Sequence, residues 1–208
     1  QIMPVARELA VIPLSQNALV NASPLTQTFP LFRDKSGVYH FPDTISVFGE
    51  FGFAMNVVDK REGTNNVYQF HRAELMVDGN LEFELSYDRI PFNQGKFAKT
   101  MIEYDLKRKN LGEFQKLYRL PEHRKISIHS LDKSGILGLA PGVHSVEIRI
   151  LDAHGNKTII KGTVAATFPM TLEASEIFRD DKVVTLALSP KRGGLALRDA
   201  VVYSFTKY

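Results

Sequence analysis

The 208-residue chain contains no cysteine. This absence excludes disulfide bonds, thiolate metal sites and cysteine nucleophiles. A cysteine-free chain suits a reducing compartment, and it equally suits a bacterial envelope protein that folds without disulfides. The absence of cysteine therefore does not choose between the two.

Long hydrophobic runs are also missing. No stretch approaches the roughly 20 apolar residues that cross a bilayer, so we expect no membrane span. The chain begins with Gln1 and has no charged and then apolar leader. We therefore expect a mature or excised product from which any signal peptide has been removed.

Catalytic and metal-binding motifs are absent as well. The six histidines never occur in H-x-H, H-x-x-x-D or H-E-x-x-H spacing, and no G-x-S-x-G sequence is present. A carboxylate pair and an oxygen-lined calcium loop over 59–66 stay open as alternatives. Turn and loop roles explain the candidate acids better, and these are Asp59, Glu62, Asp78 and Asp88. We expect no catalytic residue, no metal ligand and no cofactor.

The formal net charge is only +3, which is too small to predict nucleic-acid binding. Positive charge is nevertheless concentrated over residues 96–125, which contain nine Lys and Arg residues and four Asp and Glu residues. Such charges are usually solvated on the wet side of a helix, and the alternative is contact with an anionic polymer. The candidate contact residues are Lys99, Lys107, Arg108, Lys109 and Tyr118.

Tryptophan is absent, although the chain has 14 Phe and 7 Tyr. Most of the phenylalanines alternate with polar residues on one parity, which predicts a core role. A stand-alone carbohydrate- or polymer-binding module would need exposed aromatic platforms. The candidates for that role are Tyr39, Tyr68 and Tyr118.

Alternating apolar residues dominate what is present. Residues 67–88 alternate on both sides of Asp78-Gly79, the signature of a hairpin with a tight two-residue turn. The apolar positions shift from one parity to the other near His71-Arg72, and we interpret this phase slip as a bulge. Residues 37–59 keep one parity, with Gly49 and Gly52 at a bend, and residues 143–164 predict a second hairpin.

One segment breaks the strand pattern. Apolar rows at helical spacing, one of them Phe97, Met101 and Tyr104, predict a helix near 94–109 that begins at Asn93. The expected fold class is mainly β, an antiparallel β-sandwich of Ig-like or jelly-roll-like type with this one inserted helix.

Three parts of the chain are expected. Residues 1–36 predict a linker and edge strands, and residues 37–165 the main β-sandwich. Residues 166–208 predict an additional β segment, which either completes the main sheet or forms a small second domain with residues 1–33.

Nine short sequences, by their order and spacing along the chain, carry a family resemblance. They are VNASP (20–24), GVYHF (37–41), ISVFGEFG (45–52), DKREGTNNVY (59–68), LMVDG (75–79), YDRIPF (87–92), IEYD (102–105), FQKLYRLP (114–121) and HSVEIRILDAHGN (144–156). Over residues 6–163 the chain resembles the non-catalytic β domain that accompanies lysostaphin-type (LytM) zinc metalloendopeptidases of the bacterial envelope. In that family an H-x-x-x-D and an H-x-H motif on the upstream domain hold the zinc, and this sequence has neither.

The resemblance implies a non-catalytic accessory domain of a peptidoglycan metalloendopeptidase, in the periplasm or secreted to the cell surface. Its partners would be the upstream peptidase domain of the same polypeptide and the wall polymer, with no nucleic acid. The alternative that the residues leave open is a stand-alone carbohydrate- or polymer-binding β-sandwich module.

Overall fold

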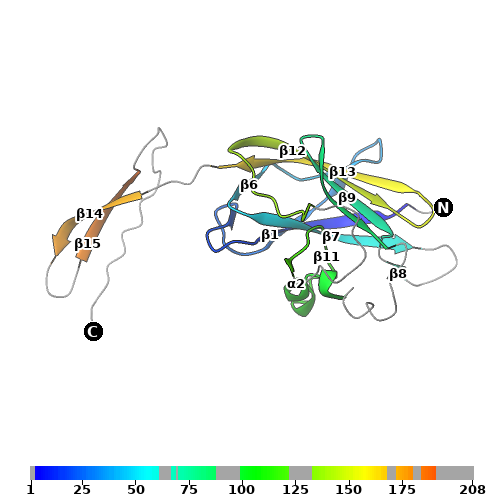
Figure 1. Cartoon of the computed structure of the whole chain (residues 1–208), viewed down its shortest axis with the longest axis horizontal. Coiled ribbons are helices and arrows are strands. Elements are labelled where there is room, and N and C mark those ends of the chain that lie inside the picture. The colour runs from blue at the N-terminus through cyan, green and yellow to red at the C-terminus, as the bar shows by residue number, and fades with distance from the viewer. Residues whose placement is uncertain are drawn as a thin grey trace. The chain divides into compact units, whose positions relative to one another are not determined.

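The computed structural model describes residues 3–60, 67–68, 70–87, 99–121, 133–167, 172–179 and 184–190. The chain divides into two compact units, Gln1–Thr167 and Phe168–Tyr208. The first unit contains two β-sheets, which confirms the expectation of a mainly β chain (Figure 1).

The smaller sheet has five strands in the order β11-β7-β1-β3, with β8 also paired to β7. Their bounds are Val5–Pro13 (β1), Gln27–Pro30 (β3), Phe51–Lys60 (β7), Val67–Tyr68 (β8) and Gln115–Lys116 (β11). All of these pairs are antiparallel.

Strand β1 corrects the expectation of a linker and edge strands over residues 1–36. It lies between β7 and β3, and the side chains of Leu9, Ala10 and Val11 are fully buried. Residues 1–33 therefore belong to the first unit and do not join residues 166–208 in a second domain. Pro13, which lacks a backbone donor, is the last residue of the strand.

The larger sheet has eight strands in the order β10-β9-β12-β13-β5-β4, with β6 paired to β13 and β2 to β6. Their bounds are Leu19–Val20 (β2), Phe32–Arg33 (β4), Tyr39–His40 (β5), Ile45–Phe48 (β6), Arg72–Val77 (β9), Asn80–Ser86 (β10), Gly142–Leu151 (β12) and Lys157–Ala166 (β13). β13 pairs in parallel with β5 and with β6, which corrects the expectation of purely antiparallel sheets.

Both predicted hairpins form. Strands β9 and β10 meet at Asp78-Gly79, whose φ angles of 50° and 79° are those of a turn with two left-handed residues. Strands β12 and β13 pair along their whole length, from Gly142 opposite Ala166 to Leu151 opposite Lys157.

The phase slip near His71-Arg72 has a different cause from the one expected. Strand β8, before the slip, pairs with β7 in the smaller sheet, while β9, after it, pairs with β10 and β12 in the larger sheet. The chain therefore changes sheets at this point. The register irregularity of this hairpin lies in β10, between Leu81 and Phe83.

Gly49 and Glu50 form another change of sheet. They separate β6, which belongs to the larger sheet, from β7, which belongs to the smaller one. The bend that the sequence predicts at Gly49 is thus the corner where the chain passes from one sheet to the other.

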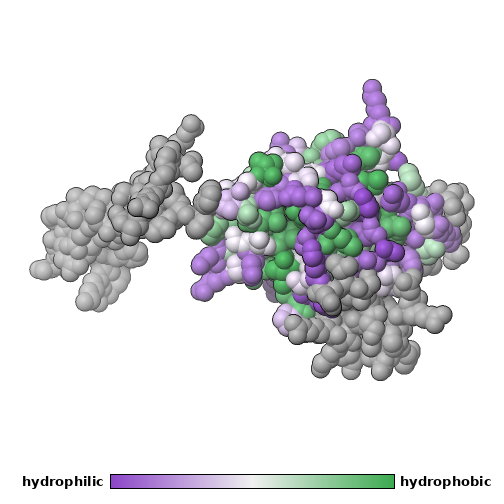
Figure 2. Space-filling view, turned by 45° about the horizontal axis from the view of Figure 1, so that its top comes forward, coloured by the Kyte–Doolittle hydropathy of each residue, from purple (hydrophilic) through white to green (hydrophobic). Residues whose placement is uncertain are grey.

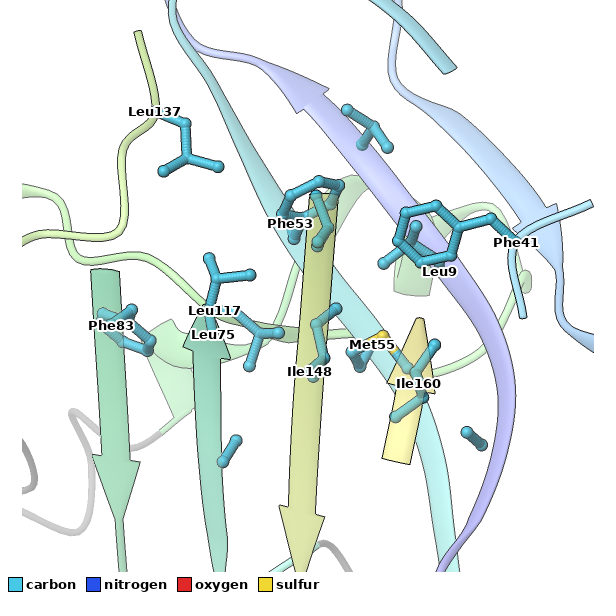
Figure 3. Close-up of a cluster of buried hydrophobic side chains, with 14 of the residues drawn as sticks. Leu9, Phe41, Phe53, Met55, Leu75, Phe83, Leu117, Leu137, Ile148 and Ile160 are labelled. Carbon is cyan, nitrogen blue, oxygen red and sulfur yellow. The ribbon is translucent and has the colours of Figure 1, made fainter. Parts of the chain in front are cut away.

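The side chains that the two sheets turn toward each other form one hydrophobic cluster (Figure 3). The cluster includes Leu9, Phe53 and Met55 from the smaller sheet and Leu75, Phe83, Ile148 and Ile160 from the larger one. Gly162 on β13 leaves the space that the Phe41 ring fills, because a Cβ added there would lie 2.0 Å from the ring.

The helical segment is described from residue 99 onward. It consists of a 3₁₀ turn, Lys99–Met101 (η2), and one short helix, Tyr104–Arg108 (α2). The start predicted at Asn93 lies outside the described residues. Within the helix predicted near 94–109, the described residues thus contain two short helical pieces over 99–108, which bears the prediction out only weakly.

In the second unit, β14 (Leu172–Arg179) and β15 (Val184–Pro190) form an antiparallel pair. These two strands lie within residues 166–208, where the sequence predicts an additional β segment. No helix in the described part of the chain is both long enough and apolar enough to cross a membrane.

Candidate functional site

The helix α2 packs on the face of the smaller sheet that is turned away from the main core (Figure 1). The second hydrophobic cluster holds it there, formed by Ala10, Ile12, Ala54, Leu106, Phe114 and Tyr118. The backbone N–H of Glu103 donates to the carbonyl of Phe114 at 2.7 Å. Leu106 is the buried side chain of α2, so burial of this one residue fixes which face of the helix is exposed.

The opposite face of α2 carries an exposed aromatic ring and two cations. Tyr104 is 69% exposed, and the side chains of Lys107 and Arg108 follow it at helical spacings of three and four residues. Leu111, one turn further, is 48% exposed. We call this region the α2 surface, comprising Lys99, Tyr104, Lys107, Arg108, Lys109 and Leu111.

The charges on the α2 surface are paired only weakly. Lys107 Nζ lies 2.6 Å from Glu113 Oε1, and Arg108 lies 4.0 Å from Asp105 Oδ1. All four of these side chains are at least half exposed. Ion pairs in water contribute only about 0–1 kcal/mol, so an external anion can exchange for the internal one.

A more buried polar group supports the α2 surface from behind. Lys116 Nζ donates to the Thr100 carbonyl at 3.2 Å and lies 3.9 Å from Glu103 Oε2. The Tyr118 hydroxyl donates to the same Glu103 oxygen at 3.1 Å. These contacts join Lys116 of β11 and Tyr118 to Thr100 in η2 and to Glu103 directly before α2, and they help to hold the start of α2 in place.

Tyr118 is therefore corrected as a contact residue. It is 1% exposed, and Gly52 leaves the space that the ring occupies, since a Cβ there would lie 2.4 Å from it. Tyr39, another candidate platform, is 8% exposed with the Arg33 guanidinium 5.8 Å from its ring centre. The side chain of Tyr68 lies outside the described residues.

Tyr104 is the residue that the sequence interpretation missed. The helical spacing groups Tyr104 in an apolar row with Phe97 and Met101. Of the two members of this row that the structure describes, Met101 is buried and Tyr104 is exposed. A signal was available, because Tyr104 shares its helix face with Lys107 and Arg108, and a face that carries two cations is the wet one. Lys99, Lys107, Arg108 and Lys109, by contrast, are all exposed as expected.

The outer face of the larger sheet is the second candidate. A groove of about 520 Å³ runs over it, and its lining includes Met76, Glu147, Arg149, Lys161 and Thr163. In Figure 2 the visible face of the first unit carries hydrophilic residues interspersed with hydrophobic ones, without one dominant apolar area.

The charged groups of this groove already bind one another. They belong to a row of alternating sign that crosses β10, β9, β12 and β13, formed in order by Glu84, Arg72, Glu74, Arg149, Glu147 and Lys161. Arg149 Nε donates to Glu147 Oε1 at 2.6 Å, and this contact lowers the pKa of Glu147 even though its partial burial acts the other way. A charged ligand would have to displace these partners, so the row is better explained as cross-strand stabilisation.

Two histidine–aspartate pairs have the residue types of a catalytic base and the carboxylate that orients it. His40 Nε2 donates to Asp34 Oδ2 at 2.7 Å, and hydrogen bonds from Ser36, His40 and Val38 hold the pKa of Asp34 far below its usual value. His144 contacts Asp78 at the same distance. The nearby Ser145 hydroxyl donates to Asp78 and not to the imidazole, so this pair does not have the geometry of a serine nucleophile and its base.

The remaining chemical candidates lie outside the described residues. They are the side chains of Asp59, Glu62 and Asp88 and the loop over 61–66. Within the ranges that are described, no group of three or more His, Asp or Glu side chains is positioned to hold a metal ion. Comparison of the chain with family models, with curated proteins and with solved structures finds no match.

Proposed function

We propose that this chain is a non-catalytic β module of a bacterial cell-wall metalloendopeptidase, located in the periplasm or at the cell surface. It positions or regulates the peptidase domain of the same polypeptide and contacts the wall polymer. The ordered motifs over residues 6–163 support this proposal, together with the absence of the H-x-x-x-D and H-x-H motifs from the sequence. We further propose that the two sheets form a sandwich of Ig-like or jelly-roll-like type.

The observation that carries the wall contact is the α2 surface. Its four cations exceed the two neighbouring carboxylates, Asp105 and Glu113, and the exposed Tyr104 ring lies among them. Peptidoglycan combines sugar rings with the free carboxylates of its stem peptides. An aromatic face suits the first and Lys or Arg the second.

The contribution of each group can be estimated. Covering about 50 Å² of the Tyr104 ring at about 25 cal/mol per Å² gives about 1.3 kcal/mol, a factor of about nine in affinity. Reversing two exposed cations replaces two weak attractions by repulsions and costs about 1–2 kcal/mol. Either change should thus weaken binding about tenfold.

The test is co-sedimentation of the purified chain with insoluble peptidoglycan at low and high salt. We expect saturable binding that Tyr104→Ala and the double variant K107E/R108E each weaken about tenfold. The matched control is K35E/K157E, which changes the formal charge equally at two exposed lysines outside the α2 surface. Equal losses in both double variants would show that only the net charge matters, and would contradict the proposed contact.

A second assay separates the module from an enzyme. The purified chain should release no peptides from peptidoglycan. Peptide release that a metal chelator abolishes would overturn the non-catalytic assignment.

The alternative function is a stand-alone carbohydrate- or polymer-binding module. The exposure of Tyr104 supports it as well, because such modules use exposed aromatic rings. The two proposals differ in the parent gene. A reading frame that encodes H-x-x-x-D and H-x-H motifs upstream of Gln1 favours the accessory module, and a frame without them favours the stand-alone one.

A further inference from the structure

The imidazole of His144 lies between two hydrogen-bond acceptors. Its Nδ1 is 2.7 Å from Asp78 Oδ2, and its Nε2 is 2.7 Å from the carbonyl oxygen of Ala140. Asp78 belongs to the β9–β10 turn, and Ala140 belongs to the loop that precedes β12. One side chain thus joins two segments that lie more than 60 residues apart in sequence.

A neutral imidazole cannot satisfy both contacts. It carries one N–H, so one of its nitrogens would present a lone pair to an oxygen at 2.7 Å. The imidazolium carries an N–H on both nitrogens and donates to both acceptors. The geometry therefore selects the charged form of His144.

The surroundings of the ring reinforce this choice. Among the described residues, Asp78 is the charged group in contact with the ring, Gly142 lies close to Nε2, and β13 places Val164 opposite His144. The second oxygen of Asp78 accepts hydrogen bonds from the Ser145 backbone N–H at 2.8 Å and from its hydroxyl. The backbone N–H of Asp78 donates in turn to the Ser145 carbonyl at 2.9 Å.

We propose that protonated His144 is a pH-sensitive clamp that fastens the loop at 138–142 to the β9–β10 turn, and that loss of its proton opens the clamp. The hydrogen bonds of Asp78 and Ala140 both favour the charged ring and raise the pKa of His144 above its ordinary 6.5. The hydrogen bond from His144, together with those from Ser145, lowers the pKa of Asp78. Between these two values both groups are charged and the clamp is closed. It opens as the pH rises through the pKa of His144.

Opening the clamp would loosen one end of the groove on the larger sheet, since Gly79 and Ser145 both line it. The clamp is independent of the α2 surface, which lies on the other sheet. Its failure and the failure of the proposed wall contact are therefore distinguishable.

The test is a pH titration of the whole chain labelled with ¹⁵N-histidine. We expect both His144 ring nitrogens to carry protons at pH 6.5 and its titration midpoint to lie above that pH. The midpoint should fall in Asp78→Asn, because Asn tolerates the positive φ of residue 78 but carries no charge. A neutral His144 at pH 6.5, or a midpoint unchanged by Asp78→Asn, would overturn the proposal.

Amide hydrogen exchange measures the opening itself. After correction for intrinsic exchange, protection of the Ser145 amide should fall as the pH passes the His144 midpoint, while that of Ile148 in the middle of β12 stays constant. In His144→Gln this pH dependence should vanish, because glutamine does not titrate. The pH dependence should persist in His154→Gln. His154 donates to Asp152 Oδ1 through its backbone N–H, which this substitution keeps. Protection of Ser145 that ignores pH in the wild type would refute the clamp even if His144→Gln fails to fold.

Discussion

Replacing Gly162 with alanine tests how tightly the core is packed. The new Cβ would lie 2.0 Å from Cδ2 and 2.1 Å from Cγ of Phe41. This is roughly 1.5 Å short of the ordinary separation of about 3.5 Å between carbon atoms. The Phe41 ring cannot withdraw freely, because it is 5% exposed and its centre lies 6.2 Å from that of Phe53.

The size of the effect follows from this overlap. Overpacking of a close-packed core costs about 1–3 kcal/mol, so we expect Gly162→Ala to lower the free energy of unfolding by about that amount. Phe41→Ala alone should cost about 3–5 kcal/mol through the cavity it leaves. With the ring removed, Gly162→Ala should cost nothing and should stabilise the strand by about 0.5 kcal/mol, because alanine suits a strand interior better than glycine. The two effects should therefore be strongly non-additive.

Urea unfolding followed by far-ultraviolet circular dichroism measures all four members of this cycle. Gly138→Ala is the matched control, since its Cβ would meet only Glu50 Cγ, at an ordinary contact distance of 3.9 Å. That variant should unfold like the wild type. The packing argument fails if Gly162→Ala is as stable as Gly138→Ala, or if the Gly162 and Phe41 effects simply add.

Three further predictions concern other parts of the first unit. Leu106→Ala removes the buried side chain that anchors α2. In thermal unfolding it should lower the free energy of unfolding by about 2–5 kcal/mol, and peptidoglycan binding should weaken in parallel. Asp34 has a pKa far below the ordinary 3.8, so its stabilising contribution is complete above that pH and is lost as the pH falls through the lowered value. The urea midpoint should thus drop on acidification below about pH 4, and Asp34→Asn should reduce the drop; an equal drop in both proteins would contradict this assignment. Glu74→Gln removes the carboxylate between Arg72 and Arg149. It should lower the free energy of unfolding by about 1 kcal/mol at low salt and by less at high salt, because salt screens the row of charges. A loss that does not depend on salt would argue against a stabilising role of this row.

The hairpins were predictable because their signals are local. Asp78-Gly79 and the alternation on each side of it specify turn and strands within about 20 residues. The corner at Gly49 was predictable for the same reason. The phase slip at His71-Arg72 was visible, but a pattern of burial does not tell a bulge from a change of sheet, since both shift the buried parity by one residue.

Elements that depend on distant partners were not predictable. Strand β1 lies in the segment predicted as a linker and edge strands, yet its pairing with both β3 and β7 makes it an interior strand. The placement of Tyr104 and Tyr118 also depended on tertiary packing. Leu106 anchors α2 with one face outward, and the space beside Gly52 takes the Tyr118 ring inward. Tyr104 lies in the segment near 94–109 where periodicity predicts one helix.

The most direct test of the proposed wall contact is nuclear magnetic resonance mapping of the intact chain with soluble peptidoglycan fragments. Saturable shifts should concentrate in the amides of residues 99–113, and they should be strongly reduced in K107E/R108E but not in K35E/K157E. Shifts concentrated on the outer face of the larger sheet, or no shifts at fragment concentrations in the millimolar range, would contradict the proposal that the α2 surface contacts the wall.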